Sequence, residues 1–267
     1  MRKRFDDRWI ILHGETLGKC EICEGSLKKL VEDEFSVFER NSIVNPTKFS
    51  IKSEMEHDVA NAYGWEEIIA NEKLHKAEIT DLNAVKIKKI FDLAKNRYQH
   101  LSMDSNVKSI LFYHNNFSYP HFSFRLFALP FVPMDLNLEY NKFLREKIKS
   151  DCIFCKLVEQ QNSFFENEHV KVVKSFAPRF NFEFTVFPKR HVKDITELKD
   201  EEMLALSEAI LSLVKLIKSY NVNFYEIAFY NAPIGEDFHL HVYVNSVELK
   251  DTLSRYGVDL VYKGGMK

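Results

Sequence analysis

The sequence predicts an α+β protein built of two similar halves, and three observations carry this prediction. A motif of the form His-x-x-acid-Ile-Thr-acid-Leu occurs twice, at residues 75–82 and 191–198. Each copy lies between a strand-like segment and a helix-like segment, and a Cys-x-x-Cys pair precedes each copy. Because a layout that recurs in the same order indicates two units of one architecture, we predict halves at residues 1–148 and 149–267.

Composition and charge place the chain among ordinary globular proteins. Of its 267 residues, 45% are hydrophobic and 28% are charged, and the formal net charge is −2 at pH 7. This balance provides no broad positive field for nucleic acid. No apolar run approaches the roughly 18 residues that span a bilayer, and no apolar signal-peptide core follows the basic N-terminus. We therefore expect a cytoplasmic protein with neither a membrane nor nucleic acid as a partner.

Strand-like segments lead into both copies of the motif, at residues 65–70 and 182–187. The segments that follow the copies have helical periodicity, which predicts core packing along one face. In the second helix, Asp200 is the expected cap, and Glu201 and Glu202 suit the positive N-terminal end. Its apolar face consists of Met203, Leu206, Ile210, Leu213 and Ile217. The first helix offers a less regular set, Val85, Phe91, Ala94 and Tyr98.

A further strand-rich stretch in each half leads to a histidine. Residues 109–113 precede His121, and residues 226–230 precede His239. Counted from the motif histidine of each half, the separations are similar, 121 − 75 = 46 and 239 − 191 = 48 residues. Each half therefore reads Cys-x-x-Cys, strands, His, helix, strands, His. The division near residue 148 follows a helix-like segment at 138–148.

These cysteines and histidines predict two metal sites. The chain has only four cysteines, all of them in the two pairs, and in a reducing compartment this spacing favours metal ligands over disulfides. Two thiolates and two imidazoles suit tetrahedral Zn²⁺ with no open position, so each zinc site is expected to be structural and to add to folding stability. The predicted ligands are Cys20, Cys23, His75 and His121 in the first site, and Cys152, Cys155, His191 and His239 in the second.

Several motifs resemble the histidine triad (HIT-like) superfamily. In the second half they are most similar to the C-terminal half of the galactose-1-phosphate uridylyltransferases. The second-half motifs are Cys152-x-x-Cys155, Phe-Ala-Pro-Arg-Phe-Asn-Phe-Glu at 176–183, Pro-Lys-Arg-His at 188–191 and Phe-His-Leu-His-Val at 238–242. The first half agrees more loosely, through Cys20-x-x-Cys23, Phe112-x-x-Asn115 and residues 128–133.

The resemblance implies tandem HIT-like halves, each an antiparallel sheet with flanking helices, and assembly as a homodimer. It also implies a ping-pong reaction in which a histidine attacks the α-phosphorus of a nucleotide sugar. A uridylyl-histidine forms, and a sugar 1-phosphate then accepts the nucleoside monophosphate. This chemistry needs a neutral imidazole as nucleophile and donors for the phosphate oxygens. On this basis Asn115 is a candidate substrate-binding residue.

The nucleophile position departs from the family pattern. The family motif is His-Pro-His-x-Gln, in which the first histidine binds zinc, the second is the nucleophile and the glutamine contacts phosphate. Counting back without gaps from residues 128–130 places His121 on the zinc ligand, Ser123 on the nucleophile and Arg125 on the glutamine. A serine hydroxyl needs an activating base, and its phosphate ester is less labile than a phosphohistidine.

An alternative alignment places residues 119–121 on His-Pro-His, so that His121 is the nucleophile. This alignment removes a zinc ligand and needs a gap. We prefer the gap-free alignment, because it completes the tetrahedral site. In either alignment, Arg125 is either a solvated strand residue or a residue whose guanidinium group binds phosphate in a bidentate manner.

The second half keeps two histidines at the corresponding place. By parity with the first half, His239 is the metal ligand and His241 occupies the nucleophile position. The smaller HIT hydrolases suggest another register, with His239 as nucleophile and Asp237 before it. In some uridylyltransferases both histidines, with a glutamate near Glu139, hold a second metal ion. The sequence leaves these assignments open.

From the sequence we predict a nucleotidyltransferase that acts on a nucleotide sugar or a nucleotide, with Ser123 in place of the usual nucleophile. The catalytic candidates are Ser123 and His241, and the substrate-binding candidates are Asn115 and Arg125. Two alternatives remain: a catalytically inactive, zinc-stabilised nucleotide-binding protein, and a hydrolase of a nucleotide phosphoanhydride. Nucleic-acid binding through zinc ribbons is not expected, because the Cys-x-x-Cys pairs lie far from their histidines in the sequence.

Overall fold

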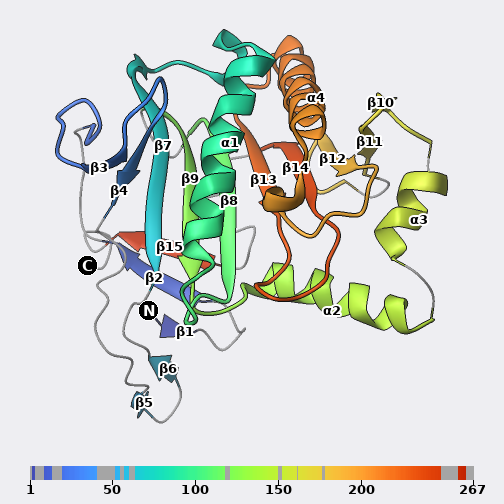
Figure 1. Cartoon of the computed structure of the whole chain (residues 1–267), viewed down its shortest axis with the longest axis horizontal. Helices are drawn as coiled ribbons and strands as arrows, with labels where there is room; N and C mark the ends of the chain where they lie inside the picture. The colour runs from blue at the N-terminus through green and yellow to red at the C-terminus, as the bar shows by residue number, and fades with distance from the viewer. Residues whose placement is uncertain are drawn as a thin grey trace.

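The computed structural model has the α+β architecture that the sequence predicts (Figure 1). The described residues are 2–3, 9–13, 20–40, 52–54, 57–59, 64–117, 121–149, 152–160, 162–175, 178–247 and 258–262. None of the helices in these ranges is both long and apolar enough to cross a membrane.

One sheet of ten strands runs through the molecule in the order β10-β11-β12-β14-β13-β8-β9-β7-β4-β3, with antiparallel neighbours. The strands of the first half are β3 (Lys28–Val31), β4 (Ser36–Glu39), β7 (Trp65–His75), β8 (Ser109–Asn115) and β9 (His121–Leu129). Those of the second half are β10 (Phe165–Glu166), β11 (Val170–Lys174), β12 (Glu183–Pro188), β13 (Tyr225–Tyr230) and β14 (His241–Ser246). The halves join where β8 pairs with β13, with Tyr113 opposite Ala228. They therefore share one continuous sheet.

A smaller sheet contains five short strands in the order β15-β2-β1-β6-β5. Its strands are β1 (Arg2–Lys3), β2 (Trp9–His13), β5 (Lys52–Glu54), β6 (His57–Val59) and β15 (Val258–Tyr262). β15 lies parallel to β2. A strand from the C-terminal part of the chain thus completes a sheet whose other strands come from the N-terminal part.

Helices α1 (Ala84–Leu101) and α4 (Asp200–Ser219) pack against each other over the large sheet (Figure 1). The buried cluster beneath them contains side chains of both halves. In it, the Phe91 ring lies 5.9 Å from the Phe112 ring and 5.1 Å from the Phe229 ring, measured between centroids. α2 (Met134–Lys149) and α3 (Ile153–Gln160) contribute to a second cluster, which contains the alternate residues of β8 and β13. Because alternate residues of a strand point to opposite faces, the two clusters lie on opposite sides of the sheet.

Each copy of the repeated motif forms one turn of 3-10 helix, η1 (Ile79–Asp81) and η2 (Ile195–Glu197). The two isoleucines are fully buried. The second acidic residue of each motif folds back onto the backbone: Asp81 accepts a hydrogen bond from the N–H of Glu78 at 2.8 Å, and Glu197 accepts one from Lys193 at 2.9 Å. The motif therefore specifies a tight turn that leads the chain from a strand into a helix.

The helix ends differ in part from the sequence prediction. Asp200 is the first residue of α4 rather than its cap, which is Lys199. Glu202 accepts the Lys199 N–H at 2.8 Å and so satisfies a donor at the helix start. The apolar stripe of α4 is buried as predicted. In α1, however, Val85 is 56% exposed, because it lies on the outer face of the first turn.

Burial of His114 predicts a pH-dependent contribution to stability. The Nδ1 atom of its ring lies 2.7 Å from the carbonyl oxygen of Ser123, and burial lowers the pKa of His114 from 6.5 to about 4. The neutral ring stabilises the fold above pH 6.5. This contribution is lost as the pH falls toward 4, because the unfolded chain then binds a proton that the folded chain does not.

We expect the stability advantage of the wild type over His114→Gln to shrink by about 2 kcal/mol between pH 7 and pH 5. Urea unfolding of both proteins at several pH values measures this difference. An advantage that stays constant over this range would show that the folded-state pKa of His114 is not depressed.

Candidate metal centres and active site

The first predicted metal site forms where three segments meet. Cys20 and Cys23 lie in the turn before β3, His75 ends β7 and His121 begins β9. The ladder between β7 and β9 places His75 opposite His121. Cys23 Sγ lies 3.2 Å from His75 Nδ1 and 3.5 Å from His121 Nδ1, and Cys20 Sγ lies 3.5 Å from His121 Nδ1. The four predicted ligands therefore converge.

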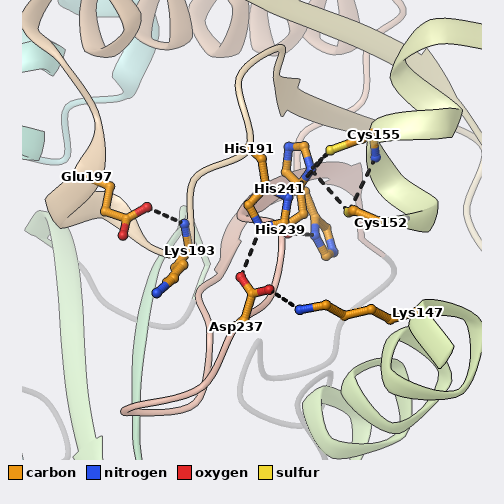
Figure 2. A network of polar contacts seen from close by, with 9 residues as sticks. All are labelled: Lys147, Cys152, Cys155, His191, Lys193, Glu197, Asp237, His239 and His241. Carbon is orange, nitrogen blue, oxygen red and sulfur yellow. Dashed lines mark hydrogen bonds and ion pairs between the residues drawn. The ribbon is translucent and has the colours of Figure 1, made fainter. Parts of the chain in front are cut away.

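The second predicted site repeats this arrangement (Figure 2). Cys152 directly precedes α3 and Cys155 lies in its first turn, while His191 follows β12 and His239 lies two residues before β14. Cys155 Sγ is 3.4 Å from the Nδ1 atoms of both His191 and His239. Cys152 Sγ is 3.7 Å from His239 Nδ1. All eight residues that the sequence selects as ligands thus lie in the two clusters.

The spacing of the ligand atoms suits a tetrahedral zinc ion. Zinc binds thiolate sulfur at about 2.3 Å and imidazole nitrogen at about 2.0 Å, which places these atoms about 3.5 Å apart in a tetrahedron. The observed distances between sulfur and Nδ1 range from 3.2 to 3.7 Å. Both clusters are compatible with zinc on this criterion.

The ring protons of two histidines are also placed correctly for metal binding. His121 Nε2 lies 2.7 Å from the carbonyl oxygen of Asn71, and His239 Nε2 lies 3.0 Å from that of Pro188. An Nε2–H that donates to a carbonyl leaves the Nδ1 lone pair directed at the cysteines. Burial lowers the pKa of His239 to about 4, so the ring stays in the neutral form that a metal requires.

Burial in the second cluster favours the neutral thiol form of Cys155. Burial, together with the neighbouring Cys152, raises the pKa of the Cys155 thiol to about 12. Without a cation, the Cys155 thiol is therefore protonated at neutral pH. A metal ion reverses this preference, because a coordinating thiol is deprotonated outright.

The positions of His121 and His239 help to choose between the alternative alignments with the family motif. His121 lies in the first cluster with both ring nitrogens occupied, which favours the gap-free alignment over the one that makes it the nucleophile. Residues 119–120 of the second alignment lie outside the described part of the chain. His239 lies in the second cluster, apart from the contact that joins His241 to Glu139. This geometry favours His239 as a structural ligand rather than as the nucleophile.

Ser123 lies on β9, opposite Ala70 of β7, and its side chain is buried. Its neighbours Phe122 and Phe124 belong to the core under the helices, so the serine points to the other face of the sheet. Its hydroxyl forms no hydrogen bond with a histidine or carboxylate of the described residues. His114 bonds to the carbonyl of Ser123 instead. None of the described residues therefore provides Ser123 with the base that a serine nucleophile needs.

Arg125 is 5% exposed, which is inconsistent with a solvated strand residue. Its Nε atom lies 3.8 Å from a carboxylate oxygen of Glu66, and Arg40 lies 3.7 Å from the same oxygen. Arg40 also pairs with Glu21 at 2.8 Å. Arg125 therefore belongs to a buried cluster of alternating charges, in which each guanidinium has an acidic neighbour. Glu66 and Arg40 were not predicted from the sequence as members of this cluster.

His241 is enclosed by aromatic rings and is 0% exposed. Its ring centroid lies 4.9 Å from that of Phe154. Its Nδ1 atom lies 2.9 Å from the carbonyl oxygen of His239, and its Nε2 atom lies 3.1 Å from a carboxylate oxygen of Glu139. The hydroxyl of Tyr243 donates to the other oxygen of Glu139 at 2.7 Å. Tyr243 was missed, although its position two residues after His241 places it on the same strand face.

The two candidate catalytic residues lie on different strands of the sheet. Ser123 is on β9 and His241 is on β14, with β8 and β13 between them. Strands in a sheet are about 4.8 Å apart, so three steps separate the residues by about 14 Å. One phosphorus atom cannot contact both side chains.

A cavity of about 820 Å³ opens where β12 begins and β14 ends, a volume that suits a small-molecule ligand. Its described lining includes Arg179, Phe180, Asn181 and Ser246. Asn115 lies at the same end of the large sheet, because it pairs with Glu226 at the start of β13.

Sequence comparisons relate the chain to proteins of known family. A family model described as "Scavenger mRNA decapping enzyme C-term binding" matches residues 151–256. A galactose-1-phosphate uridylyltransferase of Thermotoga maritima is 25% identical over 90% of this chain and 84% of its own length. An uncharacterized HIT-like protein of Methanocaldococcus jannaschii is 26% identical over 35% of this chain and 76% of its own length.

Solved structures extend the similarity to the whole fold. A uridylyltransferase mutant superposes with a TM-score of 0.82 at 23% identity, covering 92% of this chain and 84% of the other. An ADP-glucose phosphorylase from Arabidopsis thaliana, solved with bound ADP-glucose, superposes with a TM-score of 0.73 at 16% identity, covering 92% and 86%. The chain is therefore a homologue of the galactose-1-phosphate uridylyltransferases and has their fold, as the sequence resemblance predicted.

Proposed function

We propose that the chain binds a nucleotide sugar or a nucleotide and transfers its nucleotidyl group without a phosphohistidine intermediate. A function of the nucleotidyltransferase type agrees with the relatives. One observation carries the rest of the proposal. Because His121 lies in the first metal cluster, the residue two positions along the same strand face is at the nucleophile position. That residue is Ser123, which has no described base.

The reaction is then a single displacement. An oxygen of the acceptor attacks the α-phosphorus of the nucleotide sugar, the bond to the bridging oxygen breaks, and the sugar 1-phosphate leaves with that oxygen. Such a step needs positioning and charge stabilisation rather than a nucleophilic side chain. Asn115, from the sequence prediction, and Arg179 are the candidate phosphate donors, and the ring of Phe180 can stack on a base.

Zinc is proposed for both clusters as a structural ion. Four protein ligands leave no open position for substrate or water, so the metal supports the fold around the site and takes no part in the transfer. Assembly as a homodimer and a cytoplasmic location stay predictions from the sequence.

We expect that Ser123→Ala retains transfer activity within about threefold of the wild type, because a hydroxyl without a base contributes little as a nucleophile. The assay supplies α-³²P-labelled UDP-glucose or ADP-glucose with a hexose 1-phosphate or inorganic phosphate and separates the labelled products. Ser207→Ala is a matched control, since Ser207 is buried in α4 and bonds only to its own helix at 2.8 Å. A loss of a hundredfold or more in Ser123→Ala alone would assign the hydroxyl a chemical role.

The alternative is a zinc-stabilised nucleotide-binding protein without turnover. The enclosure of His241 supports it against a phosphohistidine enzyme, because the ring is 0% exposed and lies against Phe154. A binding protein is stabilised by its ligand without forming product, by about 2.7 kcal/mol at a hundred times the dissociation constant. Unfolding curves with UDP-glucose, ADP-glucose and AMP measure this shift. Stabilisation without product supports the alternative, and product formation excludes it.

A further inference from the structure

The two metal clusters differ in what supports the motif histidine of each. In the second cluster, His191 Nε2 lies 3.0 Å from a carboxylate oxygen of Asp237. The other oxygen of Asp237 accepts a hydrogen bond from the ammonium group of Lys147 on α2, so that Lys147, Asp237 and His191 form a chain that ends at the cysteines (Figure 2). In the first cluster, the corresponding His75 is exposed. Among the described residues, none forms a hydrogen bond with its Nε2 atom.

A carboxylate behind a ligating imidazole strengthens metal binding. It fixes the ring orientation, holds the proton on the far nitrogen and increases the basicity of the ligating one. Removing such a partner weakens metal binding by about 10- to 100-fold. His191 has this support, whereas His75 must be ordered by the metal itself.

Helix α2 holds the loop that carries Asp237. Besides Lys147, the helix contributes Tyr140, whose hydroxyl donates to a carboxylate oxygen of Glu236 at 2.6 Å. Two adjacent acidic residues of the loop are thus held by the same helix. The carboxylate of Asp237 is 35% exposed, so in the absence of Lys147 it is free to turn toward water. Lys147 therefore keeps Asp237 directed at His191.

We propose that the second cluster holds its metal ion more tightly than the first, and that Asp237, oriented by Lys147, is the positioning residue responsible. This inference rests on the proposal that both clusters bind metal. When metal is scarce, the first cluster releases its ion first. The turn with Cys20 and the start of β9, which carries Ser123, then lose their support while the second half retains its own.

Because trypsin cleaves after lysine, the cysteines of the two clusters are released on different peptides, and the labelling of each cluster can be measured separately. Trypsin releases Cys20 and Cys23 together on residues 20–28, and Cys152 and Cys155 together on residues 150–156. The zinc-loaded full chain is challenged with a chelator in the presence of N-ethylmaleimide, and mass spectrometry follows the labelling of both peptides. Each rate is normalised to that of the same peptide in the metal-free chain. We expect peptide 20–28 to be labelled first.

Three variants test the role of Asp237. In Asp237→Ala, labelling of peptide 150–156 is expected to be about 10- to 100-fold faster, with peptide 20–28 unchanged. Asp237→Asn keeps an acceptor oxygen and should give an intermediate rate, and Lys147→Met should act in the same direction as Asp237→Ala. Asp92→Asn is the control, because Asp92 bonds Lys88 on the surface of α1 at 2.9 Å and should change neither rate. A general loss of stability would accelerate both peptides and so differs from the expected pattern.

The zinc content of each protein, measured before the challenge, distinguishes a failure of metal binding itself from a failure of the proposed difference between the two clusters. With two zinc ions per chain, equal release from both clusters, earlier release from the second, or no effect of Asp237→Ala overturns this inference and leaves metal binding intact. A chain that binds no zinc overturns the metal proposal, and this inference with it.

Discussion

Replacing Cys155 by serine is expected to lower the free energy of unfolding of the zinc-loaded protein by about 4 kcal/mol, which corresponds to roughly thousandfold weaker zinc binding. Cys155 is the cysteine of the second cluster whose sulfur lies 3.4 Å from the Nδ1 atoms of both His191 and His239. A serine hydroxyl at this place is neutral and cannot replace the thiolate. Structural zinc supplies about 10–16 kcal/mol in small zinc-binding domains, so losing part of it is a large effect.

Urea unfolding with and without a chelator isolates the part of this effect that depends on metal. In zinc-free samples the wild type and Cys155→Ser should unfold at nearly the same urea concentration, because the substitution then changes only a partly buried side chain. If the substitution costs the same free energy with and without zinc, the role of Cys155 is packing rather than ligation.

Phe229→Ala is expected to lower the free energy of unfolding by about 3–5 kcal/mol, because it leaves a cavity in a closely packed core. Phe229 lies on β13, the strand of the second half that pairs with the first half. Its ring centroid lies 5.1 Å from that of Phe91 and 4.7 Å from that of Phe112, both in the first half. The loss should therefore destabilise both halves.

Hydrogen exchange measured separately on α1 and α4 tests whether the halves share this loss. Phe224→Ala is the matched control, because Phe224 is 37% exposed and its removal should cost little. Faster exchange in α4 but not in α1 would indicate that the halves are stabilised independently, contrary to a shared core.

The convergence of the cysteines and histidines in two clusters could be predicted from the sequence because each cluster contains a short, repeated pattern. The two Cys-x-x-Cys pairs and the two motif histidines recur in the same order, and the structure brings them together as predicted. The repeat also predicted a strand before and a helix after the motif in each half. These features are local, so the residues that specify them lie close together in the sequence.

The continuity of the sheet could not be predicted in this way. All seven residues of β8 and all six of β13 are buried, and a strand that is buried on both faces lacks the regular alternation of polar and apolar residues that would indicate an exposed face or an edge. The pairing of β8 with β13 depends on contacts more than a hundred residues apart. In the same way, the sequence did not link Arg125 to Glu66, which lies on another strand, and it connected Glu139 to His241 only through the family resemblance.

The mechanism proposed for this chain is nucleotidyl transfer without a phosphohistidine. A single-turnover reaction with α-³²P-labelled UDP-glucose, followed by acid treatment of the trapped protein, tests this mechanism. We expect no acid-labile label on the zinc-loaded protein, and labelled product only when an acceptor is present. An acid-labile protein label that is lost on His241→Ala, His239→Ala or His121→Ala would contradict this mechanism and would identify the nucleophile.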